Sequence, residues 1–154
     1  MGIGILDQLS FARTGTLSTV AELTQTEANI IPQGFNNNIL WNLGHLYLSQ
    51  ERFAFHFVQE PMLIPSGFLE LFGKGSKPEA WAQAPDLGEI VNLLEAQPNR
   101  IREKLQGRLQ DAVTNPPPIP GITFSTVEDM LTFNLYHEGI HVQAIRMLRR
   151  LIAK

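Results

Sequence analysis

The feature that most constrains the fold is a stripe of residues, three or four positions apart, along the C-terminal segment of the chain. With this spacing the members share one face of an α-helix. The stripe consists of Val127, Met130, Asn134, His137, His141, Ala144, Ile145, Leu148 and Leu151. Most of these side chains are apolar, as on a helix face that packs against other helices, but polar side chains interrupt its middle. The segment therefore predicts an amphipathic helix whose buried face carries two imidazoles.

His137 and His141 are separated by one helical turn within this stripe. At about 100° per residue, four residues bring the second ring to within about 40° of the first, roughly 6 Å further along the axis. Two imidazoles in this arrangement can bind one divalent cation, whereas an unpaired polar group in a core costs about 1–3 kcal/mol. His45 lies on the inward stripe of another helical segment, so we predict that the three histidines form a metal site. His56 lies off that stripe and is expected at the surface or its boundary.

Three earlier segments also show helical periodicity. The first is expected from Ile3 to Ala28, before the turn Pro32-Gln33-Gly34. The second is expected to begin after the asparagines at 36–38 and to run to Pro61, with the inward positions Trp41, His45, Leu48, Arg52 and Phe55. The third is expected from about Leu87 to Val113, with a kink or break at Pro98, and Ser125-Thr126-Val127-Glu128 is expected to cap the fourth.

The stretch between Glu60 and Asp86 is rich in proline and glycine and is expected to form a long crossover with one short helix at 68–72. No segment alternates apolar and polar residues for long enough to indicate a sheet. The predicted fold is all-α: a four-helix bundle with a long crossover between helices 2 and 3, which then run parallel. With 154 residues, 44% hydrophobic and 18% charged, the chain suits one domain spanning 1–154.

Composition excludes several classes of function. The chain has no cysteine, so disulfides, thiolate metal ligands and a protein thiol nucleophile are excluded. A formal net charge of -3 gives no general attraction to nucleic acid. The N-terminus contains Asp7 and does not resemble a signal peptide, and no apolar run approaches the ~18 residues of a membrane span. The expected location is cytoplasmic, with no membrane or nucleic-acid partner.

Three neutral imidazoles leave a divalent ion charged and with an open coordination position, the pattern of a catalytic rather than a closed structural site. Such an ion lowers the pKa of a bound water or thiol, which suits either hydrolysis or transfer of a thiolate. A non-catalytic bundle whose metal holds helices together remains a third alternative. The thiol would come from a small cosubstrate, because the protein has none.

His137 to His141 also match the H-E-x-x-H pattern of zinc peptidases, with Glu138 as a tentative catalytic base. That class needs a further ligand downstream, and no histidine, aspartate or glutamate follows His141. Glu138 points about 100° away from His137 and is otherwise a flank residue. Two other residues keep alternative roles: Asn134 is a partner of a ligand ring or part of a polar layer, and Arg52 is an anion-binding or a salt-bridging residue. Trp41 is expected in the core, where it also suits a pocket wall.

The segment Ile39-Leu40-Trp41-Asn42-Leu43-Gly44-His45-Leu46, followed about ninety residues later by Tyr136-His137-Glu138-Gly139-Ile140-His141, resembles the DinB-like superfamily of metal-dependent proteins. The resemblance extends over nearly the whole chain. It implies a four-helix bundle, often a homodimer, that binds nickel or zinc through His45, His137 and His141. It also implies a small-molecule substrate and, in some members, transfer or isomerisation with a low-molecular-weight thiol. One difference is that Gln143 and Ala144 stand where many relatives have a Gly-Gln pair.

Overall fold

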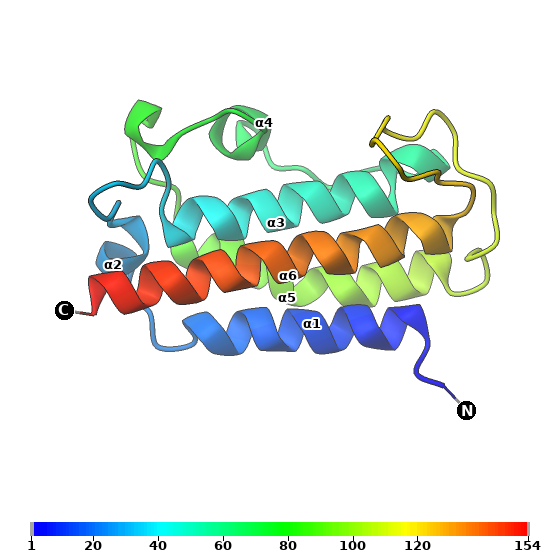
Figure 1. Cartoon of the computed structure of the whole chain (residues 1–154), viewed down its shortest axis with the longest axis horizontal. Coiled ribbons are helices and arrows are strands. Elements are labelled where there is room, and N and C mark those ends of the chain that lie inside the picture. The colour runs from blue at the N-terminus through cyan, green and yellow to red at the C-terminus, as the bar shows by residue number, and fades with distance from the viewer. Residues whose placement is uncertain (1, 154) are drawn as a thin grey trace.

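The computed structural model describes residues 2–153, and every regular element among them is a helix (Figure 1). Four long helices lie side by side: α1 (Ile5–Val20), α3 (Ile39–Ala54), α5 (Leu87–Leu105) and α6 (Val127–Ile152). Two short helices, α2 (Gln25–Asn29) and α4 (Phe68–Phe72), and two 3-10 turns, His56–Val58 and Pro78–Ala80, lie in the connections. The structure confirms the all-α fold class. No helix in this part of the chain is long and apolar enough to cross a membrane.

Side-chain contacts fix the directions of the four long helices. Arg102 binds Asp7 while Arg13 binds the Leu94 carbonyl, so α1 and α5 run in opposite directions. Arg13 and Thr19 of α1 contact residues 138 and 149 of α6, so these two helices run parallel. The colours of Figure 1 show α3 and α5 running the same way, opposite to α6. The connection from 55 to 86, which includes α4, therefore returns the chain along the length of the bundle.

The first predicted helix is wrong in extent, because the structure divides it into α1 and α2. Thr24 begins a new helix: its hydroxyl accepts a hydrogen bond from the Glu27 amide at 3.2 Å, and the Glu27 carboxylate accepts one from the Thr24 amide at 2.9 Å. This capping box satisfies amide groups that a continuous helix would have bonded internally. The second predicted helix is also too long, since α3 ends at Ala54 and the 3-10 turn that follows closes on Gln59 in the left-handed conformation.

The third predicted helix ends at Leu105 rather than Val113. Beyond it the chain turns back, and the Val113 amide donates to the Ser125 carbonyl beside the start of α6. Pro98 does not divide α5. Proline has no N–H for the carbonyl four residues earlier, Leu94, and Arg13 Nη1 donates to that carbonyl instead at 2.8 Å. A cation from α1 thus satisfies the acceptor that Pro98 leaves free.

The cap of α6 lies one residue later than predicted. Thr126 rather than Ser125 is the N-cap, and Asp129 rather than Glu128 completes the capping box. The short helix predicted at 68–72 is confirmed as α4.

Two apolar clusters fill the two ends of the bundle. One joins the start of α3 to α4, the start of α5 and the end of α6. The other joins the start of α1 to the ends of α3 and α5 and the start of α6. The buried side chains of Arg13, Gln50, Gln97, Asn134 and Glu138 lie between these clusters, so the middle of the bundle is where the molecule can build a site.

Candidate metal centre

The structure brings the three predicted histidines together in the middle of the bundle. His45 comes from α3, and His137 and His141 come from successive turns of α6. The ring centroids are 4.6 Å apart for His137 and His141, 4.8 Å for His45 and His141, and 5.3 Å for His45 and His137. One nitrogen from each ring lies within 4.8 Å of the others. The antiparallel packing of α3 on α6 therefore produces the convergence that helical spacing predicted.

The donor set and its spacing fit a divalent metal ion. Imidazole nitrogens bind zinc at about 2.0–2.1 Å, so two ligands at a tetrahedral angle are about 3.4 Å apart. The nitrogens lie within 4.8 Å of one another, so side-chain movements of roughly 1 Å bring them to this spacing. All three rings are half-buried, and no carboxylate belongs to the cluster in the part of the chain that the structure describes.

Hydrogen bonds orient two of the rings. His45 Nδ1 donates to the Phe72 carbonyl at 2.7 Å, and His141 Nδ1 donates to Asn42 Oδ1 at 2.8 Å. The Asn42 amide nitrogen is itself bonded to the Asn38 carbonyl, which leaves Oδ1 as the acceptor. With the proton held on Nδ1, the lone pair of each ring is on Nε2. Partners of this kind fix the tautomer and orientation of metal-binding histidines.

His137 differs from the other two rings. Its Nδ1 is buried and has no hydrogen-bond partner among residues 2–153, and the same holds for Nδ2 of Asn134 one turn earlier. Asn134 therefore makes no hydrogen bond to a ligand ring in this structure, which leaves its role in a polar layer. A buried imidazole nitrogen without a partner is uncommon and costly. Such an atom is expected where a bound ligand satisfies the site.

Burial lowers the pKa of all three imidazoles. It is the main cause for His137, whose pKa falls to about 4, and for His141, whose pKa falls to about 3. The neighbouring rings lower both values further, since two charged imidazoles at this distance repel. Burial also lowers the pKa of His45, which the Phe72 carbonyl partly offsets and the Arg52 charge reinforces. All three rings are therefore neutral at pH 7, the form that binds metal.

The contacts around the His45 ring explain why Trp41 and Gly44 occur in this segment. Trp41 stacks on it, with ring centroids 4.7 Å apart and planes at 10°, and Trp41 Nε1 donates to Ser76 Oγ at 2.8 Å. Gly44 faces the Phe72 ring so closely that a β-carbon would overlap it. The missing side chain lets α4 lie against α3, which brings the Phe72 carbonyl within reach of His45. Trp41 thus both packs in the core and forms a wall of the site, as the sequence suggested.

We expect Gly44→Ala to lower the free energy of unfolding by about 1–3 kcal/mol, because the buried Phe72 ring must move. The same movement weakens the His45 hydrogen bond, so metal affinity should fall about tenfold or more. Urea unfolding and metal titration measure the two effects. Gly139→Ala is the matched control, since a β-carbon there meets nothing within 4 Å and alanine favours a helix. Wild-type stability and affinity in Gly44→Ala would contradict this account.

Glu138, the tentative catalytic base, lies in a different environment. Its side chain is buried and directed toward α1, where Oε1 accepts from Arg13 Nε at 2.9 Å and from Thr16 Oγ1 at 2.7 Å. Oε2 accepts from Arg13 Nη2 at 3.2 Å. With both oxygens bound and no place in the histidine cluster, Glu138 matches a structural residue better than a base.

Sequence reasoning missed the polar layer to which Glu138 belongs. Arg13 is 1% exposed and also binds Gln50 of α3 and Gln97 of α5, so the layer takes a residue from each long helix. A signal was present, because Arg13 recurs with Leu6, Leu9, Thr16 and Val20 on the buried face of α1. A charged side chain on the buried face of a helix needs a hydrogen-bonding or charged partner, as a buried histidine does.

The two remaining residues singled out from the sequence lie at the surface. Arg52 is exposed, although its position on the α3 stripe was predicted to face inward, and His56 is exposed as expected.

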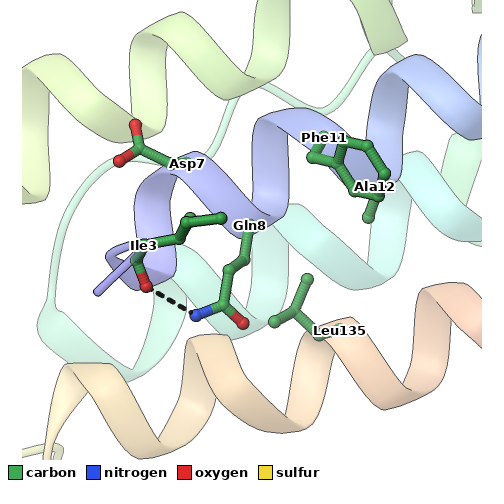
Figure 2. A pocket seen from close by; sticks show the side chains of 6 residues that line it. All are labelled: Ile3, Asp7, Gln8, Phe11, Ala12 and Leu135. Carbon is green, nitrogen blue, oxygen red and sulfur yellow. Dashed lines mark hydrogen bonds between the residues drawn. The ribbon is translucent and has the colours of Figure 1, made fainter. Parts of the chain in front are cut away.

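One pocket of about 600 Å³ lies away from the histidines. Figure 2 shows the residues that line it at the start of α1, namely Ile3, Asp7, Gln8, Phe11 and Ala12, with Leu135 of α6. Its acidic side chain, Asp7, is bound to Arg102, and Phe11 is 82% exposed. A smaller pocket of about 130 Å³ lies beside the histidines. Proximity to the histidine cluster makes the smaller pocket the one relevant to chemistry at a metal ion bound there.

Comparison with known families gives one match. A family model described as the DinB superfamily matches residues 8–145, a span that contains all three histidines and the polar layer. Comparison with curated proteins gives no significant match.

Proposed function

This chain belongs to the DinB superfamily, and we propose that it binds one divalent metal ion, nickel or zinc, through His45, His137 and His141. The observation that carries the proposal is the convergence of three neutral imidazole nitrogens within 4.8 Å, supplied by two helices. Nothing in the donor set distinguishes nickel from zinc, since both accept imidazole ligands. The choice of these two metals follows from the family resemblance.

A divalent ion held by three neutral ligands acts as a Lewis acid and lowers the pKa of a water or thiol at its open position. The protein's own groups prepare the site for that role. The Phe72 carbonyl and Asn42 Oδ1 keep two imidazoles in one tautomer, and Trp41 covers one side of His45. Ser49 Oγ lies 3.3 Å from His45 Nε2, so the side of the cluster near the small pocket is lined by a hydroxyl.

We further propose that the reaction is transfer of a low-molecular-weight thiol to an electrophilic carbon. In that step the thiolate sulfur forms a C–S bond, and either a leaving group departs with its electron pair or an activated double bond takes up the proton. Hydrolysis is less well supported, because Glu138 is bound to Arg13 and no other carboxylate joins the cluster in residues 2–153. Hydrolysis at such sites commonly uses a positioned carboxylate base. The absence of cysteine means that the sulfur must come from a cosubstrate.

The transferase proposal predicts metal-dependent consumption of thiol. Wild-type protein loaded with nickel or zinc is incubated with glutathione or cysteine and a panel of alkyl halides, epoxides and activated alkenes, and free thiol is followed with time. Thiol loss should exceed that with the control variant His45→Ala treated with the same metal, since this variant lacks one ligand and should not retain the ion. No excess with any thiol and electrophile would end the transferase proposal while leaving metal binding intact.

The alternative of a non-catalytic metal-binding dimer is tested by metal removal. In our proposal the metal-free bundle stays folded, because neither apolar cluster at its ends includes a histidine. Collapse of the melting transition on chelation would favour a metal that serves mainly to hold the helices together. The homodimer that the resemblance implies stays a prediction, which sedimentation velocity tests directly.

A further inference from the structure

The pocket beside the histidines is formed by three parts of the chain. Its lining consists of Ser49, Arg52 and Phe53 of α3, Phe57 of the following 3-10 turn, and Pro117 and Ile119 of the connector before α6. Two of these residues also touch the metal centre. The Ser49 hydroxyl lies 3.3 Å from His45 Nε2, and the Phe53 ring packs edge-on against His137 with centroids 5.8 Å apart. The pocket therefore shares a wall with His45 and His137.

The size and walls of this pocket select a small apolar group. Its volume of about 130 Å³ is close to the ~150 Å³ of a cavity that holds benzene. Phe53, Phe57 and Ile119 offer aromatic and aliphatic surface, whereas Ser49 contributes a hydroxyl on the side of His45. A ring or a short branched chain fits such a space, and a peptide or a sugar chain does not.

Among the residues that line this pocket, Arg52 carries a charge. The guanidinium is exposed and makes no salt bridge or hydrogen bond within residues 2–153. The contrast with four other arginines is clear, since Arg13, Arg100, Arg102 and Arg108 each bind a carboxylate. Glu51, adjacent to Arg52 in sequence, is directed away from it and binds Arg100. A planar guanidinium with free donors beside an apolar space suits an organic carboxylate.

We propose that this pocket binds the electrophilic substrate of the reaction, and that the substrate is an organic carboxylate with one ring-sized apolar body. The body lies among Phe53, Phe57 and Ile119, and the carboxylate accepts hydrogen bonds from Arg52. The Ser49 side of the pocket then directs the rest of the molecule toward the three imidazoles. The identification of this ligand as substrate rests on the proposed function, whereas its binding does not.

Benzoate tests the proposal without metal or turnover. Titration of metal-free wild-type protein, followed by ligand-observed NMR and calorimetry, should show saturable binding of benzoate and weaker binding of benzamide, which lacks the charge. Arg52→Gln should weaken benzoate about tenfold or more and leave benzamide unchanged. Arg146→Gln, at another exposed arginine on α6, is the matched control and should bind benzoate as the wild type does.

A second variant tests the apolar part of the pocket. Ile119→Trp fills the space among the rings and should abolish binding of both probes. Benzoate binding that is absent from the wild type, or equal in the wild type and Arg52→Gln, would overturn the proposal, as would unchanged binding in Ile119→Trp. Metal uptake is measured on the same proteins. Benzoate binding by a wild-type protein that takes up no metal would refute the metal proposal and leave the pocket assignment standing.

Discussion

Replacing Glu138 with alanine is expected to lower the free energy of unfolding by about 3–5 kcal/mol, one of the largest effects available to a single substitution in this chain. The reason lies with its partner. The Arg13 side chain is 2% exposed and donates to both Glu138 oxygens, at 2.9 and 3.2 Å. Without the carboxylate, a guanidinium remains in the interior with only neutral acceptors, namely Gln50, Gln97 and the Leu94 carbonyl.

Urea unfolding of metal-free protein at pH 7 measures the loss. Glu103→Ala, at an exposed glutamate of α5, is the matched control and should change the unfolding free energy by no more than about 0.5 kcal/mol. The double variant Arg13→Met, Glu138→Met should lose much less than the two single variants together, since removing both charges removes the uncompensated one. A loss below about 1 kcal/mol in Glu138→Ala, with additive single effects, would contradict the assigned role of the pair.

A conservative variant of this pair distinguishes a structural role of Glu138 from a catalytic one. Glu138→Gln keeps the shape and the acceptor oxygen for Arg13 while removing a base. If the residue acts only through Arg13, then Glu138→Gln protein that folds should keep wild-type metal content and thiol-transfer rate. A folded Glu138→Gln protein with full metal and no turnover would restore Glu138 as the base.

The second large effect is the stabilisation of the folded protein by metal. An ion that binds only the folded state adds about 4 kcal/mol to the unfolding free energy at a free concentration one thousand times its Kd. We expect the melting temperature of the wild type to rise with added nickel or zinc. His141→Ala should show no such rise, because only two of the three imidazoles remain to bind the ion.

The control for this measurement is His56→Ala, at an exposed histidine outside the cluster, which should respond to metal as the wild type does. An equal rise in His141→Ala would show that the stabilising ion binds elsewhere.

Features set by local periodicity were predictable from the sequence. The helical spacing of apolar residues gave the four long helices, and the spacing of His137 and His141 placed both rings on one face, because side-chain direction in a helix depends only on position. The convergence with His45 required one more assumption. The polar part of the inward face of α3 had to lie opposite the polar part of the inward face of α6. The structure confirms that assumption for the three rings.

Helix ends were less predictable, because capping competes with periodicity. Thr24 and Glu27 lie within an apparently continuous pattern, yet their reciprocal hydrogen bonds begin a new helix. Likewise, nothing local indicates that the segment after Leu105 turns back to pair with Ser125.

Most hydrogen-bond partners from distant segments were not predicted from the sequence. Arg13 and Glu138 are 125 residues apart, and the acceptor for His45 is a backbone carbonyl in the crossover, which leaves no trace in residue type. Gly44 is informative only once the Phe72 ring is seen against it. These contacts hold the site together, so the convergence of the three histidines was easier to predict than the residues that support them.

The most direct test of the central claim is the metal content of protein purified without added metal and then equilibrated with one divalent ion. The account predicts one ion per chain in the wild type and none in His45→Ala, His137→Ala or His141→Ala, with all three variants folded. One ion per chain retained by any of these folded variants would contradict the claim that three imidazoles from α3 and α6 bind it together.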